Sequence, residues 1–157
     1  MRIKTIFSII IVMTLMISAC SNVESQGFGK APNFTLSKSG GGEITLSEEL
    51  KGRQAVLVFF ATWCPSCVTK VPAINEFYER YRDKVSVMGV NIQESDSRIQ
   101  SFINKKGVKY PIFLDSEGKV AGLYGIRGIP AVFVVNSGGE IVYQGHSIEE
   151  AGNKLSL

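Results

Sequence analysis

Two kinds of apolar pattern follow one another through the middle of the chain: unbroken apolar runs and repeats with helical spacing. Residues 55–61 (AVLVFFA) and 85–92 (VSVMGVNI) are almost wholly apolar, which is typical of strands buried on both faces of a sheet. In residues 65–82, apolar side chains recur at spacings of three and four, with charged residues on the other side, as in an amphipathic helix. Residues 96–106 repeat that pattern behind Ser95 or Asp96 as a cap. The pattern predicts strand, helix, strand and helix in succession.

Weaker patterns on both sides of this region complete the fold prediction. Segments 131–136 and 140–144 flank Ser137-Gly138-Gly139, which is a hairpin signal. The other predicted elements are strands at 32–36, 44–46 and 112–114, a capped helical turn at 47–50, a helical turn at 119–124 and a closing helix at 148–155. Helices that alternate with buried strands, followed by a hairpin and a helix, predict an α/β sandwich around a mixed sheet.

The N-terminus has the three-part layout of a secretory signal. A positive head at residues 2–4 precedes an apolar run at 6–17, and a Ser-Ala pair then precedes Cys20. The run is short for a stable membrane span. The end of the segment resembles a bacterial lipobox, in which Cys20 receives a diacylglycerol and becomes the mature N-terminus. An uncleaved anchor and ordinary cleavage with a free cysteine are the alternatives, and all three place the domain outside the cytoplasm.

Length and composition are consistent with a single folded domain. We expect a lipoprotein signal peptide at residues 1–19, a polar flexible tether at 20–30 and the domain at 31–157. Hydrophobic residues make up 45% of the 157 residues and charged residues 20%, which excludes wholesale disorder. Without Arg2 and Lys4 the chain has 15 basic and 14 acidic residues. The charge therefore gives no support for a nucleic-acid partner.

The candidate chemistry is concentrated in Trp63-Cys64-Pro65-Ser66-Cys67, where the first buried strand meets the long helix. Two thiols three residues apart across a first helical turn can form a disulfide with little chain movement. Pro65 suits that turn, because a backbone N–H is dispensable there. Cys64 would lie near the N-cap, where free amides and the helix dipole stabilise a thiolate, and Cys67 one turn inside and more buried. We expect Cys64 to exchange with substrates and Cys67 to resolve the mixed disulfide.

Other uses of the two cysteines stay open at this point. Half of a zinc site would need two further ligands, and Cys20 and His146 are poor candidates because the first is expected to be acylated. An inert structural disulfide is a second alternative. A Cu(I) carrier is a third alternative, since two thiolates with His146 would suit that ion. Nothing in the sequence positions His146 for this purpose.

The motif and its surroundings resemble the thioredoxin superfamily. The matching features are PNF at 32–34, AVLVFFATWCPSC at 55–67, Pro72, GVN at 89–91 and GIPA at 128–131. Within the superfamily, the chain is similar to the TlpA/ResA-like membrane-tethered thiol–disulfide oxidoreductases, from about residue 30 to residue 155. Pro130 follows Cys67 by 63 positions, more than in a minimal thioredoxin. The excess agrees with the strand–helix insert of this subfamily, expected within 91–111.

The resemblance implies a fold and a site. The fold is a thioredoxin-like three-layer sandwich, a mixed sheet flanked by helices, with an N-terminal strand extension and the TlpA/ResA-type insert. The Ile129–Pro130 bond is expected to be cis and to pack beside the disulfide, which leaves the Ile129 backbone free to pair with an incoming peptide. Trp63 would cap the site and contact partners, and packing against the loop near Pro130 is a second interpretation that does not exclude the first.

The resemblance also implies an activity. Dithiol–disulfide exchange with protein substrates requires no metal, flavin or nucleotide. Relatives of this kind mostly act as reductants in cytochrome c maturation and are recharged by a membrane thiol–disulfide protein. We therefore expect an extracytoplasmic, lipid-anchored, monomeric reductase. A thiol peroxidase is the alternative enzyme, but that chemistry needs Thr three residues before the reactive Cys, where this chain has Ala61.

Two positions depart from the family pattern. Six residues before Cys64, where thioredoxins carry a buried acid and ResA-like relatives often carry Asn, this chain has Val58. Three residues after Cys67, where many relatives have Glu, it has Lys70. A nearby cation favours the thiolate, so Lys70 is expected to stabilise the reduced dithiol unless it points to solvent. Because of these two departures, the family's role in reducing apocytochromes is less firmly expected of this chain. The dithiol chemistry is still expected, since it depends on the two cysteines.

Overall fold

The computed structural model describes residues 28–157; the expected signal peptide, most of the tether and Cys20 lie outside the described residues. Within this part the chain forms a seven-stranded sheet with the order β2-β1-β5-β4-β3-β6-β7. The strands are β1 (Thr35–Lys38), β2 (Glu43–Thr45), β3 (Gln54–Phe60), β4 (Val85–Ile92), β5 (Ile112–Asp115), β6 (Ala131–Val135) and β7 (Ile141–Gly145). The helices are α2 (Leu46–Glu49), α3 (Pro65–Tyr81), α4 (Asp96–Lys106), α5 (Lys119–Leu123) and α6 (Ile148–Gly152).

The sheet is mixed, as predicted. Strands β3, β4 and β5 are parallel, whereas β6 runs antiparallel to β3 and β1 runs antiparallel to β5. Strands β3 and β4 lie at the centre and are buried almost throughout, which explains their unbroken apolar sequences. Because the three parallel strands point the same way, the segments that follow β3 and β4 meet at one edge of the sheet.

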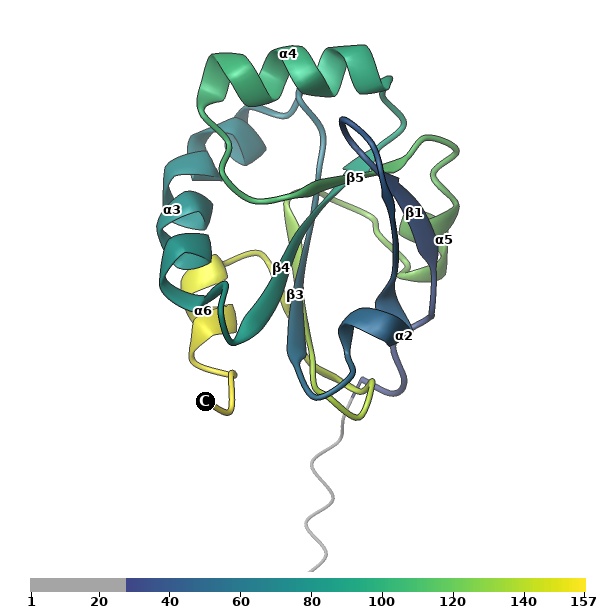
Figure 1. Ribbon diagram of the computed structural model, residues 1–157, viewed down its shortest axis with the longest axis vertical. Helices are drawn as coiled ribbons and strands as arrows, with labels where there is room; N and C mark the ends of the chain where they lie inside the picture. Colours follow the sequence, from purple (N-terminus) through teal and green to yellow (C-terminus); the bar gives the residue numbers. More distant parts are fainter. Residues whose placement is uncertain (1–27) are drawn as a thin grey trace, which may run out of the picture.

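Helices cover both faces of the sheet and complete the three layers (Figure 1). One face packs against α3, α4 and α6 through Val71, Phe102 and Ala151. The other face packs against α2 and α5 through residues that include Leu46 and Val120. This is the thioredoxin-like sandwich that the sequence predicts, with one apolar core on each side of the sheet.

The insert is a helix followed by a strand. Helix α4 occupies its predicted residues, and strand β5 begins at Ile112 as predicted and ends at Asp115, so only the helix lies within the range 91–111 expected for the insert. The β5 strand inserts between β4 and β1, so it joins the N-terminal strands to the central sheet. In Figure 1 helix α4 lies across the end of the sheet at which α3 begins.

Two terminal elements differ from their predicted bounds. The first strand starts at Thr35 rather than residue 32, because its ladder with β2 begins at the pair Thr35–Thr45. The last helix ends at Gly152 rather than residue 155, with Asn153 as its C-cap. In both cases the apolar pattern extends beyond the hydrogen-bonded element, since flanking residues can be buried without being helical or extended.

Candidate active site

The reactive motif forms the first turn of α3. Cys64 is the N-cap of this helix, and its Sγ accepts a hydrogen bond from the backbone N–H of Cys67 at 3.2 Å. Pro65 occupies the first helical position, as the sequence predicts. Cys64 and Cys67 are joined by a disulfide, with 5.3 Å between their Cα atoms. The strand-to-helix junction therefore places both sulfurs where free helix amides favour negative charge.

The surroundings of the two sulfurs differ less than expected. Cys64 is 5% exposed and Cys67 is 3% exposed, so overall burial does not separate them. The hydroxyl of Ser66 lies 3.2 Å from Cys64 Sγ. Trp63 is 68% exposed, so most of its surface faces solvent. Its indole is a large apolar surface next to Cys64 that is open to a partner.

The loop before β6 approaches the disulfide from the other side. The Ile129–Pro130 peptide bond is cis, and Cys64 Sγ lies 3.7 Å from the Ile129 carbonyl oxygen. The exposed ring of His146 places Nδ1 2.6 Å from the Pro130 carbonyl oxygen. Three segments far apart in the sequence thus meet at one point. The sequence contains no signal for the contact of His146 with this loop.

The core position beneath the site carries no acid. Val58 is 1% exposed and lies between Gly89 of β4 and Val132 of β6 in the sheet. It belongs to the same apolar cluster as Cys64 and Cys67. The position at which the sequence departs from the family pattern therefore has apolar surroundings in the structure.

A buried carboxylate that sequence reasoning missed lies behind the motif. Glu94 follows β4, and its side chain is only 3% exposed. Its carboxylate accepts hydrogen bonds from the Thr62 backbone N–H at 2.7 Å, the Thr62 hydroxyl at 2.5 Å and Asn91 Nδ2 at 2.7 Å. Arg98 Nε lies 3.7 Å from the same group. One signal in the sequence could have indicated this residue: Glu94 follows a buried parallel strand, and such strands end at the same edge of the sheet as the motif.

Lys70 lies on the side of α3 that faces α6. The pKa of Glu149, at the start of α6, is lowered first by a hydrogen bond from the Ser147 hydroxyl and also by the charge of Lys70. Lys70 is half-buried, and no hydrogen bond in the described part of the chain joins its ammonium to Cys64 or Cys67. Its influence on the sulfurs stays a prediction.

The described residues were also compared with the requirements of a metal site and of a membrane span. Among residues 28–157, no three His, Cys, Asp or Glu side chains are grouped so that they could hold a metal ion. The same range contains no helix of the length and apolarity needed to cross a membrane.

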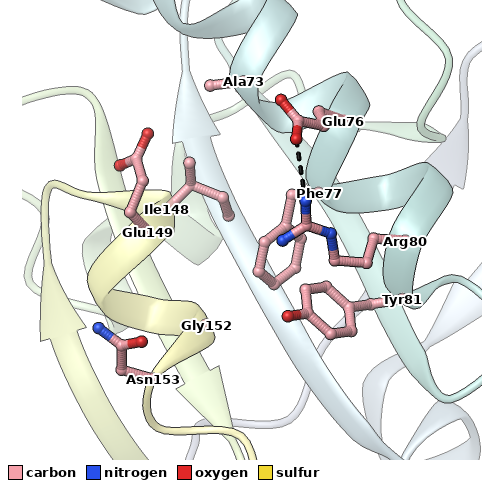
Figure 2. A pocket seen from close by; sticks show the side chains of 9 residues that line it. All are labelled: Ala73, Glu76, Phe77, Arg80, Tyr81, Ile148, Glu149, Gly152 and Asn153. Carbon is pink, nitrogen blue, oxygen red and sulfur yellow. Dashed lines mark hydrogen bonds and ion pairs between the residues drawn. The ribbon is translucent and has the colours of Figure 1, made fainter.

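A hollow of about 300 Å³ between α3 and α6 is lined by residues that include Phe77, Arg80 and Ile148 (Figure 2). Its first lining residue on α3 is Ala73, six positions after Cys67, so it lies further along the helix than the disulfide.

Comparison with known proteins agrees with this geometry. The Redoxin family profile matches residues 29–155. The chain is 35% identical over 123 residues to the thiol-disulfide oxidoreductase ResA of Bacillus thuringiensis (strain Al Hakam), covering 77% of this chain and 70% of that protein. The chain belongs to the Redoxin family. ResA of Bacillus subtilis (strain 168) is 34% identical, with 71% of this chain and 63% of that protein covered.

Solved structures of other proteins share the architecture. StoA from Bacillus subtilis superposes with a TM-score of 0.68 at 27% identity, covering 79% of this chain and 96% of that one. A thioredoxin family thiol:disulfide interchange protein from Chlorobium tepidum TLS gives a TM-score of 0.68 at 22% identity, covering 80% and 90%, and this match shows the fold alone. With Cys64 and Cys67 joined at the head of α3, this Redoxin family member is a thiol–disulfide oxidoreductase.

Proposed function

We propose that this protein is an extracytoplasmic reductase of protein disulfides that acts through the Cys64–Cys67 dithiol. The observation that carries the proposal is the N-cap position of Cys64, whose Sγ receives the Cys67 amide. An amide hydrogen bond and the positive end of a 17-residue helix stabilise a thiolate at that sulfur. A stabilised thiolate reacts at neutral pH and also leaves readily.

The exchange follows from this arrangement. The Cys64 thiolate attacks one sulfur of a substrate disulfide, the S–S bond breaks, and the other substrate sulfur leaves as a thiolate and takes up a proton. Cys67 loses its proton and attacks Cys64 Sγ, which releases the second substrate thiol and forms the Cys64–Cys67 disulfide. Two electrons and two protons pass to the substrate. A thiol–disulfide protein of the membrane would then reduce the disulfide again.

The groups around Cys64 support docking of a protein chain. The exposed indole of Trp63 offers an apolar contact on one side of the sulfur. The half-buried Ile129 and Pro130 approach it on the other side, with the Ile129 carbonyl 3.7 Å from Cys64 Sγ. A substrate strand could pair with the Ile129 backbone. We infer that these residues hold the substrate cysteine within reach of Cys64.

Trapping of mixed disulfides tests the proposed roles. Cys67→Ser removes the resolving thiol, so the bond between Cys64 and the substrate should persist. Cys64→Ser should trap little, because Cys67 lies inside the helix. The measurement is the yield of thiol-sensitive adducts on non-reducing gels, with the double serine variant as control. Equal trapping by the two single variants would overturn the assignment.

We also propose that Cys20 carries the lipid that attaches the protein to the outer side of a bacterial cytoplasmic membrane or to the periplasmic side of another membrane. The small residues before Cys20 and the short apolar run support this. A diacylglycerol with a further acyl chain binds a membrane more firmly than one chain does. Mass spectrometry of the mature protein should find a lipidated Cys20 at its N-terminus. A mature chain that starts elsewhere would exclude the anchor.

A further inference from the structure

A second hollow adjoins the reactive motif on the side of the insert. It measures about 380 Å³ and lies between the start of α3 and helix α4. Thr62 and Val68, which flank the two cysteines, line one wall, and Phe102 of α4 contributes an apolar ring. A protein bound in this hollow would therefore contact the residues on either side of the Cys64–Cys67 pair.

The rim of this hollow is basic. Arg98, Lys105 and Lys106 line it, whereas Asp96 is the one acidic residue within helix α4. Arg98 is partly balanced by Glu94 at 3.7 Å. Lys105 and Lys106 are exposed, and neither forms an ion pair with any carboxylate among residues 28–157.

Stabilisation of the helix explains only part of this arrangement. Cations in the last turn of a helix favour its C-terminus by about 0.3–1 kcal/mol, which accounts for Lys105 and Lys106 wherever α4 lies. It does not account for Arg98, which lies in the first turn, where the dipole opposes a cation. Helical spacing brings all three charges to one hollow beside the motif.

We propose that this hollow binds an acidic segment of the substrate protein next to its disulfide. Carboxylates of the segment would pair with Lys105, Lys106 and Arg98, while an apolar side chain contacts Phe102 and Val68. Opposite charges across a docking surface raise the rate of encounter and orient the partner. The inference rests on the proposed function, because it names the substrate feature that the reductase selects.

The test uses the reduced full-length protein and two synthetic peptides with the same disulfide loop, one flanked by Asp and Glu and the other by Lys. Stopped-flow kinetics gives the rate constant for reduction of each. We expect the acidic peptide to be reduced about tenfold faster at low salt, with a smaller difference at about 0.15 M salt, where screening acts beyond roughly 8 Å. The double variant Lys105→Glu/Lys106→Glu should abolish or reverse the preference.

A matched control carries the same change of charge elsewhere. Lys51 and Lys84 are exposed and precede β3 and β4, so they lie at the opposite end of these strands from the motif. Lys51→Glu/Lys84→Glu should leave the preference for the acidic peptide intact. If both double variants lower it equally, the net charge of the domain is responsible and the docking site is excluded.

Two further arms separate the possible failures. Reduction of hydroxyethyl disulfide, which is uncharged, gives each protein a reference rate, and the two peptide rates are compared after division by it. Loss of that reaction in the unaltered protein would overturn the proposed function itself, whereas equal rates for both peptides would overturn only the acidic-segment site. Binding to vesicles of anionic phospholipid is measured in parallel. If Lys105→Glu/Lys106→Glu weakens vesicle binding and leaves peptide rates unchanged, the basic rim serves a lipid surface and the proposal is wrong.

Discussion

At the scale of single residues, Glu94 joins the reactive motif to the insert. Its carboxylate accepts both the backbone N–H and the hydroxyl of Thr62, two residues before Cys64. A buried charge is costly unless it is hydrogen-bonded or paired; here Asn91 donates a further hydrogen bond and Arg98 forms an ion pair at 3.7 Å. Glu94 therefore fixes the path of the chain into the N-cap of α3, which makes it a positioning residue.

Glu94→Gln is expected to weaken this support. One of the two side-chain oxygens becomes an NH₂ group, which faces a donor and leaves it unsatisfied at about 1–3 kcal/mol. We expect unfolding free energy to fall by about that amount in urea titrations. We also expect slower reduction of a protein disulfide at temperatures where the variant is fully folded. Glu140→Gln on the exposed hairpin serves as control. An unchanged reduction rate in folded Glu94→Gln would show that its role is only structural.

Lys70 gives a second prediction at this scale. A cation near the sulfurs stabilises the thiolate and hence the reduced form, but Glu149 balances part of its charge. We expect Lys70→Glu to make the Cys64–Cys67 potential about 10–30 mV more negative, with Lys70→Gln between. A change of one unit in the thiol pKa is about 1.4 kcal/mol, which corresponds to about 30 mV for a two-electron couple. Solvent screening lowers the expected shift below this value. Equilibration with glutathione measures the three potentials. Identical values would show that the charge of Lys70 affects Glu149 of α6 but not the two sulfurs.

At the scale of elements, strand β4 must pass closely beneath the insert. Gly89 lies between Val58 of β3 and Ile112 of β5. A Cβ atom at this position would lie 2.9 Å from the ring of Tyr110 and 3.3 Å from that of Phe60. Both rings are buried. The central strand thus needs a residue without a side chain where the segment before β5 crosses it.

Gly89→Ala should destabilise the domain. The added methyl group forces buried rings apart, and overpacking of this kind costs about 1–3 kcal/mol. Gly122→Ala is a matched control, because no atom lies within 4 Å of its Cβ position in α5. That change should be neutral or stabilise by up to about 1 kcal/mol. Urea unfolding of both variants measures the difference, and equal stabilities would contradict the close approach at Gly89.

At the scale of the whole molecule, buried tyrosines set an alkaline limit to stability. Burial raises the pKa of both Tyr110 and Tyr124 above the ordinary value. Tyr124 packs on Phe59 and Phe133 in one core, and Tyr110 lies in the other. In the unfolded chain these phenols ionise near pH 10. The unfolded state therefore releases protons first, and stability that is fully present below about pH 10 is lost as the pH rises above it.

The expected loss can be measured. One pH unit above 10, each tyrosine accounts for about 1.4 kcal/mol of lost unfolding free energy. Tyr110→Phe keeps the ring and removes the ionisable group, so the decline between about pH 10 and 11 should be smaller by about 1.4 kcal/mol. Tyr124 and Tyr143, whose pKa values are also raised by burial, continue to contribute. Tyr78→Phe on α3, where the side chain is half-buried, is the control. A decline in Tyr110→Phe equal to that of the unaltered protein would contradict the assignment.

Local patterns in the sequence determined the central elements and the reactive pair. The buried strands β3 and β4, the helices α3 and α4 and the N-cap position of Cys64 follow from apolar periodicity and the chemistry of helix ends. Each of these depends on residues close together in the chain. The weak alternation near the chain ends left the bounds of β1 and α6 open, because partner strands and caps decide where they end.

The surroundings of the cysteines were decided by tertiary structure alone. Glu94 meets Thr62, His146 meets Pro130, and Lys70 comes under the influence of Glu149. Each pair joins segments that no sequence period relates. Helix α4 brings its cations to the motif only because it crosses the end of the sheet where α3 begins. The sequence places two cysteines three residues apart at a strand-to-helix junction, because that junction depends only on local pattern, whereas long-range packing decides which groups surround them and what a substrate meets beside them.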